Sequence, residues 1–259
     1  MWDRLARAGI PYTRPQGRPP KSPAALRRFV DPDGRLEGVR LKGARVLALA
    51  AGGGWDAAVF ALLGADTYLA DISAVQLRTS RDLAREKGVS IRTARVDMSD
   101  LSRFSTESFD VVWHCHSLVF VRDVRPVFRE VGRVLKPGGT YVTSTMHPTT
   151  LRLYGTYTGG GWRPRTSYFD DRAMPYTEEA DVTWEFGRVK VVAPTIEFGH
   201  TFETLVNGIA EAGMVVDGLW ETSPGDPDPD AAPGSDEHLE TLFPAFIHIR
   251  ARKLPPGTH

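Results

Sequence analysis

The chain has 259 residues, of which 41% are hydrophobic, enough for one large domain or two small ones. Lysine plus arginine equals aspartate plus glutamate at 32 each, and no basic stripe is concentrated anywhere, so we expect no nucleic acid partner. Cys115 is the single cysteine, which excludes an internal disulfide framework.

The first forty residues are rich in proline, arginine and glycine, with one short helical candidate from 24 to 30. We interpret residues 1–40 as an arm that caps the rest of the chain. The segment lacks the apolar core of a signal peptide, and no apolar run in the sequence is long enough to span a bilayer. We therefore expect a cytoplasmic protein that does not enter the membrane; whether it forms a homo-oligomer is left open.

The stretch "RVLALAAGGGWDAAVFALLGA", residues 45–65, predicts a strand, a glycine-rich turn and a helix. Three glycines in a row, Gly52, Gly53 and Gly54, are costly in chain entropy, so the backbone here must turn tightly or be approached closely. At the end of a first strand, such a turn directs main-chain N–H groups and a helix N-terminus at a polar ligand. A nucleotide-like cofactor is the first hypothesis.

Strands and helices then alternate as far as about residue 146, which predicts βαβ units and a mostly parallel sheet. A helix is expected from 74 to 87, with Ser73 as its N-cap and Gly88 just past its end, and another from 126 to 135. We take residues 41–150 as the cofactor-binding core. Its strands are expected at 45–49, 67–71, 90–95, 109–113 and 139–145.

Residues 151–200 form an insertion in which nine of fifty residues are aromatic, against 10% for the whole chain. Within it, the sequence around Gly187 and Arg188 predicts a β-hairpin that caps the substrate. Residues 201–259 complete the core, with a helix at 201–212 and strands at 215–220 and 243–252. The intervening 223–237 is so acidic and proline-rich that we expect a mobile surface loop.

Two acidic residues follow predicted strands. Asp71 ends the second strand, where a carboxylate can accept hydrogen bonds from a ribose diol; the alternative is a residue that only starts a turn. Asp97 follows the third strand and could accept from an adenine amino group, with the Met98 backbone at the ring edge. A helix N-cap is an equally good explanation of Asp97 taken alone.

The order "VLALAAGGGWDA", "LADIS", "VDMSD", "FDVVWHCHSLVFVRD", "VLKPGGTYVTS" resembles the class I S-adenosylmethionine-dependent methyltransferases over residues 40–150. The most telling part is "RVLKPGGTYV", the helix, loop and fifth strand of that family. Beyond it, the chain is more loosely similar to bacterial small-molecule methyltransferases of quinone and biotin biosynthesis. The resemblance implies an α/β, doubly wound, Rossmann-like fold with a seven-stranded sheet whose last strand is antiparallel.

The resemblance also implies a cofactor, S-adenosylmethionine, and the residues that hold it. Ala50, Gly52, Gly53 and Gly54 would line its methionine and ribose part. Asp71 would hold the ribose. Three further contacts follow from the same comparison: Ile72 beside the adenine, Asp97 with Met98 on the adenine edge, and the His114 backbone near the methionyl group.

The chain departs from the family at two positions. An acidic residue is usual where Ala48 stands, and a glycine where Ala50 stands. The first departure removes a carboxylate that helps to place the amino-acid end of the cofactor. It leaves open a protein that binds S-adenosylmethionine without transferring a methyl group. Gly52, Gly54 and Ala57 also fit the G-x-G-x-x-A fingerprint, so an NAD-dependent oxidoreductase is a second alternative.

Histidine suits the removal of a proton from a methyl acceptor at neutral pH. The candidate general bases are His116, at the edge of the fourth strand; His147, after the fifth strand and the strongest of the three; and His200, before a helix. His116 and His200 also have a structural explanation as helix-end or core residues. A metal site from His114, His116 and His147 is disfavoured because no acidic cluster accompanies it, so no metal is expected.

The methyl acceptor is expected to be a small, aromatic-bearing metabolite, methylated on O, N or C. The arm and the aromatic insertion would close over it, and an aromatic face could also stabilise the sulfonium. About half of these aromatics would instead form the small core of the hairpin. The candidate substrate contacts are Tyr12, Tyr154, Trp162, Tyr168 and Trp184.

Overall fold

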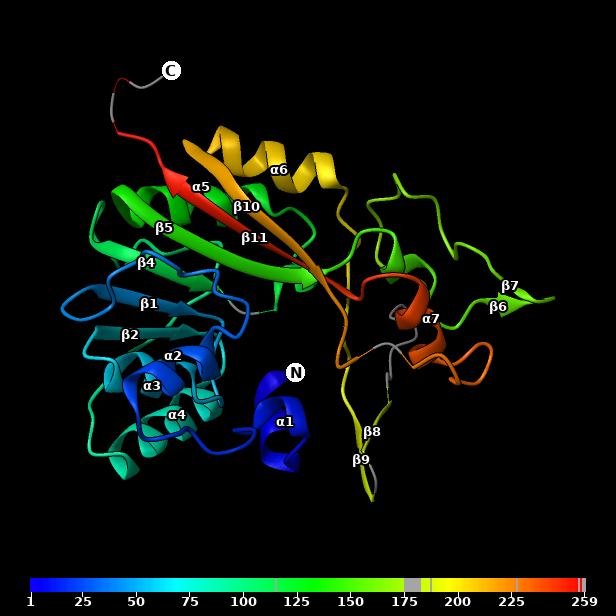
Figure 1. The fold of residues 1–259 in the computed structure, drawn as a ribbon, viewed down its shortest axis with the longest axis horizontal. Coiled ribbons are helices and arrows are strands. Elements are labelled where there is room, and N and C mark those ends of the chain that lie inside the picture. Colours follow the sequence, from blue (N-terminus) through cyan, green and yellow to red (C-terminus); the bar gives the residue numbers. More distant parts are fainter. Residues whose placement is uncertain (115, 175–182, 187, 227, 256, 258–259) are drawn as a thin grey trace.

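A computed structural model describes residues 1–114, 116–174, 183–186, 188–226, 228–255 and 257. Its centre is a seven-stranded sheet in the order β10-β11-β5-β4-β1-β2-β3 (Figure 1). The strands from β3 to β5 run parallel, and β11 is antiparallel to both of its neighbours, as predicted. The strands are β1 Arg45–Leu49, β2 Asp66–Asp71, β3 Arg92–Arg95, β4 Phe109–His114, β5 Leu135–Met146, β10 Met214–Thr222 and β11 Phe246–Lys253.

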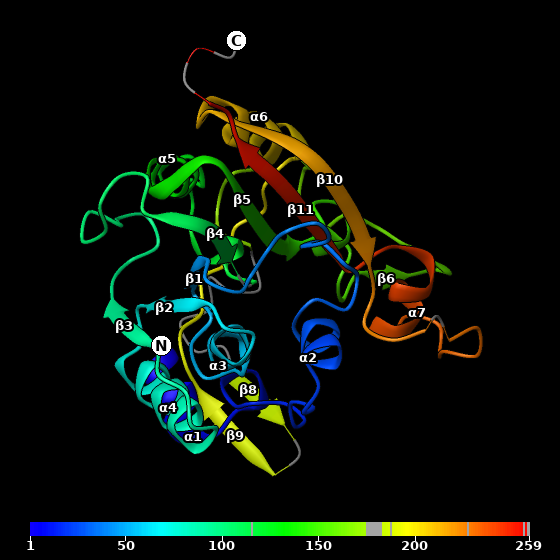
Figure 2. The same ribbon diagram turned by 60° about the vertical axis from the view of Figure 1, so that its left-hand side comes forward.

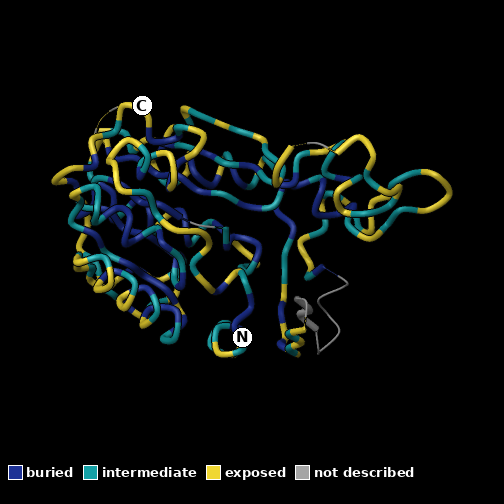
Figure 3. The backbone as a smooth tube through the Cα atoms, turned by 60° about the horizontal axis from the view of Figure 1, so that its bottom comes forward, coloured by how far each residue is buried: buried dark blue, intermediate teal, exposed yellow. Residues whose placement is uncertain are grey.

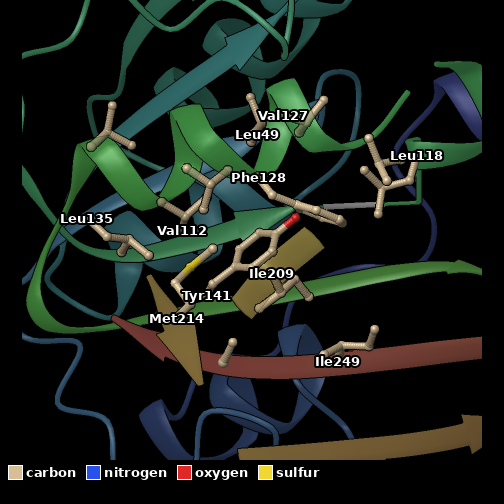
Figure 4. Packing of buried hydrophobic residues seen from close by; sticks show 14 of the residues in the cluster. Leu49, Val112, Leu118, Val127, Phe128, Leu135, Tyr141, Ile209, Met214 and Ile249 are labelled. Atoms are coloured by element: carbon tan, nitrogen blue, oxygen red, sulfur yellow. The ribbon is translucent and has the colours of Figure 1, made fainter. Parts of the chain in front are cut away.

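Helices cover both faces of this sheet (Figures 1 and 2). On one face lie α2 Pro23–Val30, α3 Asp56–Leu62 and α4 Ala74–Glu86, and on the other lie α5 Arg125–Val134 and α6 Phe202–Glu211. Successive strand residues point to opposite faces, so Trp113 packs with the α2 side chains and Val112 packs with those of α5. Figure 4 shows Phe128, Tyr141 and Ile209 meeting in the second of these cores.

Local capping signals match the predicted helix boundaries. The Ser73 hydroxyl accepts a hydrogen bond from the Gln76 N–H at 3.1 Å, and Gly88 follows α4 with φ 71°. Thr201 caps α6 in the same way, with its hydroxyl 3.0 Å from the Thr204 nitrogen. Each cap satisfies an N–H group that has no partner within the helix.

The arm is more ordered than its composition predicts. Besides α2, it contains α1 Trp2–Ala8 and the 3₁₀ turn η1 Pro11–Thr13, so the expectation of a single short helix is wrong. Leu5 and Ile10 are fully buried against Ala193 of the insertion, and the Trp2 ring meets the Phe120 ring edge-on at 5.0 Å. Tertiary burial thus stabilises a helix that is too short to form alone.

The insertion contains the predicted hairpin, β8 Thr183–Phe186 paired with β9 Val189–Val192. It also contains η3 Thr150–Arg152 and a small ribbon of β6 Tyr157–Thr158 and β7 Gly161–Trp162, and η2 Leu118–Phe120 precedes it in the chain. In the predicted surface loop 223–237, residues 224–226 and 228–230 are exposed, as expected of a surface segment. Its last part packs: Gly234 lies against the Tyr157 ring, and Ser235 caps α7 Asp236–Leu242. Figure 3 shows buried residues along the central strands and many exposed residues on the part of the chain that carries β6, β7 and α7.

No helix in the described part of the chain is both long enough and apolar enough to cross a bilayer.

Candidate functional site

The glycine loop after β1 lies in close contact with the end of β2, with α4 and with the N-terminal arm. The Gly52 N–H donates to Asp71 Oδ2 at 2.9 Å, and the Gly53 N–H donates to the Ser80 hydroxyl at 2.9 Å. A Cβ at Gly52 would lie 2.7 Å from Asp71 Oδ2, and one at Gly53 would lie 2.6 Å from the Thr13 carbonyl oxygen of the arm. These glycines are therefore required by space, and Gly53 also by its φ of 84°.

Asp71 lies at the end of β2, 7% exposed, beside this loop. Its Oδ1 accepts from the Ser73 N–H at 2.7 Å, and its Oδ2 accepts from Gly52. Burial raises the pKa of the Asp71 carboxyl, and these backbone hydrogen bonds oppose that rise. Next to it, Ile72 is 50% exposed at the rim of the sheet, so a polar acceptor and an apolar surface lie side by side.

Asp97 and Met98 follow β3 at the same edge of the sheet. Asp97 is exposed and does not cap a helix; its Oδ1 accepts from the Ser99 N–H at 2.8 Å and from the Ser99 hydroxyl at 2.7 Å. Met98 packs against the core, with its sulfur 3.7 Å from the Ser117 hydroxyl. Carboxylates thus follow two adjacent parallel strands, beside the glycine loop, which fits a ribose and an adenine.

His114 ends β4 with its side chain turned into the core. Its Nδ1 lies 2.8 Å from the Tyr141 hydroxyl and its Nε2 lies 2.7 Å from the Ser117 hydroxyl. Burial lowers the pKa of His114 to about 3, so the ring is neutral at pH 7. β4 ends at His114, and His116 lines the same cavity as His114.

A cavity of about 160 Å³ opens beside the glycine loop, on the α2 side of the sheet. Asp56 lies between the cavity and the glycine loop. Its Oδ1 accepts from the indole N–H of Trp113, which also lines the cavity, at 3.1 Å. On the other side, a Cβ at Gly54 would lie 2.9 Å from Asp56 Oδ2. His116 lines the cavity, and burial lowers its pKa to about 4. Its Nδ1 is buried and has no hydrogen-bond partner within the described chain.

Arg35 and His248 also line this cavity, and the sequence analysis missed both. Arg35 lies in the connection between α2 and β1, and His248 lies on β11. Neither belongs to a local motif, so only the pairing of β11 with β5 brings His248 next to the strand ends. Asp56 was within reach of sequence reasoning, because it directly follows the glycines and begins a helix.

His147 and His200, in contrast, use their ring nitrogens within the fold. His147 Nε2 lies 2.9 Å from Glu221 Oε1, and its Nδ1 accepts from the Thr149 N–H at 3.3 Å. His200 Nε2 donates to the Leu118 carbonyl at 3.0 Å. Burial lowers the pKa of both histidines. Of the three predicted bases, His116 is the one that lines the cavity and has a ring nitrogen without a hydrogen-bond partner in the described chain.

The aromatic residues of the insertion are spread over several contacts. The Tyr154 hydroxyl donates to Glu240 at 2.8 Å, and the Trp162 ring stacks on His238 at 5.9 Å. The Tyr168 hydroxyl accepts from the Phe202 N–H at 2.9 Å, at the start of α6. Tyr12 is 70% exposed. Trp184 lies on β8, and its side chain is outside the described part of the structure.

The two departures from the family pattern have clear surroundings. Ala48 is fully buried in an apolar cluster with Leu69 and Leu77. These apolar surroundings do not suit a carboxylate. Ala50 adopts φ 50°, a left-handed conformation that glycine adopts without strain. No group of three potential metal ligands comes together in the described ranges.

Comparisons with known proteins agree with this geometry. Residues 47–143 match the family described as "Methyltransferase domain". The "Uncharacterized methyltransferase YbaJ" of Bacillus subtilis is 35% identical over 188 residues, 71% of each chain. A ubiquinone biosynthesis O-methyltransferase of Xanthomonas oryzae is 34% identical over 109 residues, 42% of this chain and 46% of the relative.

A solved S-adenosylmethionine-dependent methyltransferase from Mesorhizobium loti has the same fold, with a TM-score of 0.68 at 24% identity. The alignment covers 89% of this chain and 96% of that one. These matches count against the NAD alternative. The family match, the 35% identity to the Bacillus subtilis relative and the shared fold show that this chain belongs to the class I S-adenosylmethionine-dependent methyltransferases, with S-adenosylmethionine as its cofactor.

Proposed function

We propose that this methyltransferase acts on a small, aromatic-bearing acceptor, at an oxygen, nitrogen or carbon atom, with His116 beside the reacting atom. The observation that carries the proposal is that His116 lines a cavity next to Asp56 and the glycine loop, with a buried Nδ1 that has no hydrogen-bond partner in the described chain. The volume of about 160 Å³ suits a compact acceptor, and the Trp113 indole provides an aromatic wall.

The cofactor would lie along the carboxyl ends of β1, β2 and β3. Asp71 would accept from the ribose hydroxyls, and the exposed face of Ile72 and the Asp97 carboxylate would meet the adenine. The glycine loop leaves room for close approach because its side chains are absent. We further propose that Asp56, next to Gly54, supplies the carboxylate that Ala48 lacks.

Bound S-adenosylmethionine supplies an electrophilic methyl group on a sulfonium. The residues of the chain then have three tasks: they hold the acceptor atom in line, exclude water and take up the released proton. Nδ1 of His116 is the atom that accepts this proton from an acceptor hydroxyl or amine. Because burial lowers its pKa to about 4, the imidazole is neutral at pH 7 and has its lone pair available.

The test is transfer of a trideuterated methyl group to a panel of phenols, amines and activated carbon acids, read by mass spectrometry with S-adenosylhomocysteine release. His116→Gln should lower kcat by about 100-fold or more while S-adenosylhomocysteine affinity is retained. His147→Gln is the matched control and should keep its kcat, because that ring is used within the fold. Tight cofactor binding with no transfer to any acceptor would favour a binding protein instead.

A further inference from the structure

The cavity beside the glycine loop is lined by basic side chains, by the Asp56 carboxylate and Trp113, and by residues of β5. The basic side chains come from distant parts of the sequence: Arg35, His114, His116 and His248. Three of them have a buried nitrogen without a hydrogen-bond partner in the described chain: Nε of Arg35, Nδ1 of His116 and Nδ1 of His248. A buried polar nitrogen without a partner costs free energy, so three such atoms around one cavity indicate a ligand that pairs with them.

Hydrogen bonds from other residues to its backbone hold Arg35 in place. Asp31 accepts from the Arg35 N–H at 2.8 Å and from the Leu36 N–H at 2.7 Å, and Arg250 donates to the Arg35 carbonyl at 3.1 Å. The connection between α2 and β1 thus passes over β11, as Figure 2 shows. The guanidinium forms an ion pair with Asp33 through Nη2 and lies near the Asp31 carboxylate, and its Nε–H is the donor that has no partner in the described chain.

The His248 imidazole adds a donor without adding charge. Burial together with the nearby Arg35 lowers its pKa to about 4, so the ring is neutral at pH 7. His248 Nε2 lies 2.8 Å from the Thr222 hydroxyl, which leaves Nδ1 for a ligand. A guanidinium N–H with a neutral imidazole N–H is suited to a carboxylate, whose two oxygens only accept hydrogen bonds.

We propose that this cavity binds the carboxylate of the methyl acceptor, with Arg35 as its counter-cation and His248 as a second positioning residue. The substrate class is therefore a small carboxylic acid, anchored by its carboxylate while another atom receives the methyl group. An apolar cavity of about 150 Å³ accommodates benzene, so the volume of about 160 Å³ admits a carboxylate with one ring or a short chain. This inference rests on the proposed function of the same site.

The first experiment titrates the protein, saturated with S-adenosylhomocysteine, with benzoate and with its neutral isostere benzamide, by calorimetry. Benzoate should bind at least 10-fold more tightly than benzamide. Arg35→Gln should weaken benzoate binding by about 10- to 100-fold. Arg45→Gln, at the amino end of β1, is the matched control and should leave the benzoate affinity unchanged. Equal affinities for benzoate and benzamide, or no benzoate binding, would show a water-filled cavity and overturn the proposal.

If Arg35→Gln does not fold, Ser144→Leu tests the same cavity from its β5 wall. This variant should abolish benzoate binding and keep S-adenosylhomocysteine affinity; unchanged benzoate binding would place the anion elsewhere and refute the proposal. A carboxylate could also come from the cofactor. Arg35→Gln would then weaken S-adenosylhomocysteine but not its decarboxylated analogue, which would overturn the assignment to the acceptor.

S-Adenosylhomocysteine binding, measured first and without benzoate, distinguishes failure of the proposed function from failure of the carboxylate site alone. No binding of S-adenosylhomocysteine would count against the proposed function itself. Normal binding of S-adenosylhomocysteine, combined with no discrimination between benzoate and benzamide, would reject the carboxylate site alone.

Discussion

Acidification from about pH 7.5 to about pH 5 should destabilise the fold through three enclosed histidines. Burial lowers the pKa of His114 to about 3 and the pKa values of His116 and His248 to about 4, from an ordinary 6.5. The unfolded chain therefore binds more protons than the folded chain in this pH range. Stability is fully present above pH 6.5 and is lost as the pH falls toward 4.

The size of the effect follows from these pKa values. At about pH 5 a histidine that is protonated in the unfolded chain and neutral in the fold costs about 2 kcal/mol. His248 is only partly buried, so solvent screening reduces its share. The three together cost at most about 6 kcal/mol, a large part of the ~5–15 kcal/mol that stabilises a typical domain. Burial lowers the pKa of His147 and His200 as well, so both act in the same direction.

The assay is urea unfolding followed by circular dichroism at several pH values between about 5 and 7.5, a range above most carboxyl titrations. His248→Gln should reduce the pH dependence of the unfolding free energy over this range by less than the ~2 kcal/mol of a fully buried ring, because His248 is only partly buried. Thr145→Val removes a buried hydroxyl but no titrating group, so its slope should match that of the unchanged chain. A stability that is flat with pH would refute the neutral burial of these rings.

Three substitutions test other parts of the molecule. Asp71→Ala should weaken S-adenosylhomocysteine binding by about 1.5–3 kcal/mol in calorimetry, because a charged acceptor for the ribose is lost; an unchanged affinity would remove Asp71 from the site. Ala50→Gly should raise the thermal unfolding temperature, since relief of about 1–2 kcal/mol of left-handed strain exceeds the entropy cost of glycine, about 0.5–1 kcal/mol; a lower temperature would show that the alanine is unstrained. Gly132→Ala should destabilise the α5–α6 pair by about 1–3 kcal/mol, because its Cβ would lie 2.3 Å from the Ala212 carbonyl oxygen; denaturant midpoints equal to those of the unchanged chain would contradict this packing.

The sequence by itself determined the parts of this protein that depend on short stretches of chain. The apolar run before Gly52 predicts β1, the Ser73 cap predicts the start of α4, and the sequence around Gly187 and Arg188 predicts the hairpin. In these three cases the interactions that decide the structure lie within a few residues. Asp71 and Asp97 could be placed because the sequence predicts parallel strands, whose carboxyl ends meet at one edge of a sheet.

Only the tertiary structure decided which polar groups remain available for a ligand. His147 is the histidine that the sequence favours as a base, yet Glu221 and Thr149 occupy its ring nitrogens, and His116 has the open one. Arg35 and His248 reach the same cavity only because β11 pairs with β5 and the α2–β1 connection passes over it. Hydrogen-bond partners and burial are set by contacts between distant segments, and local sequence patterns carry no record of them.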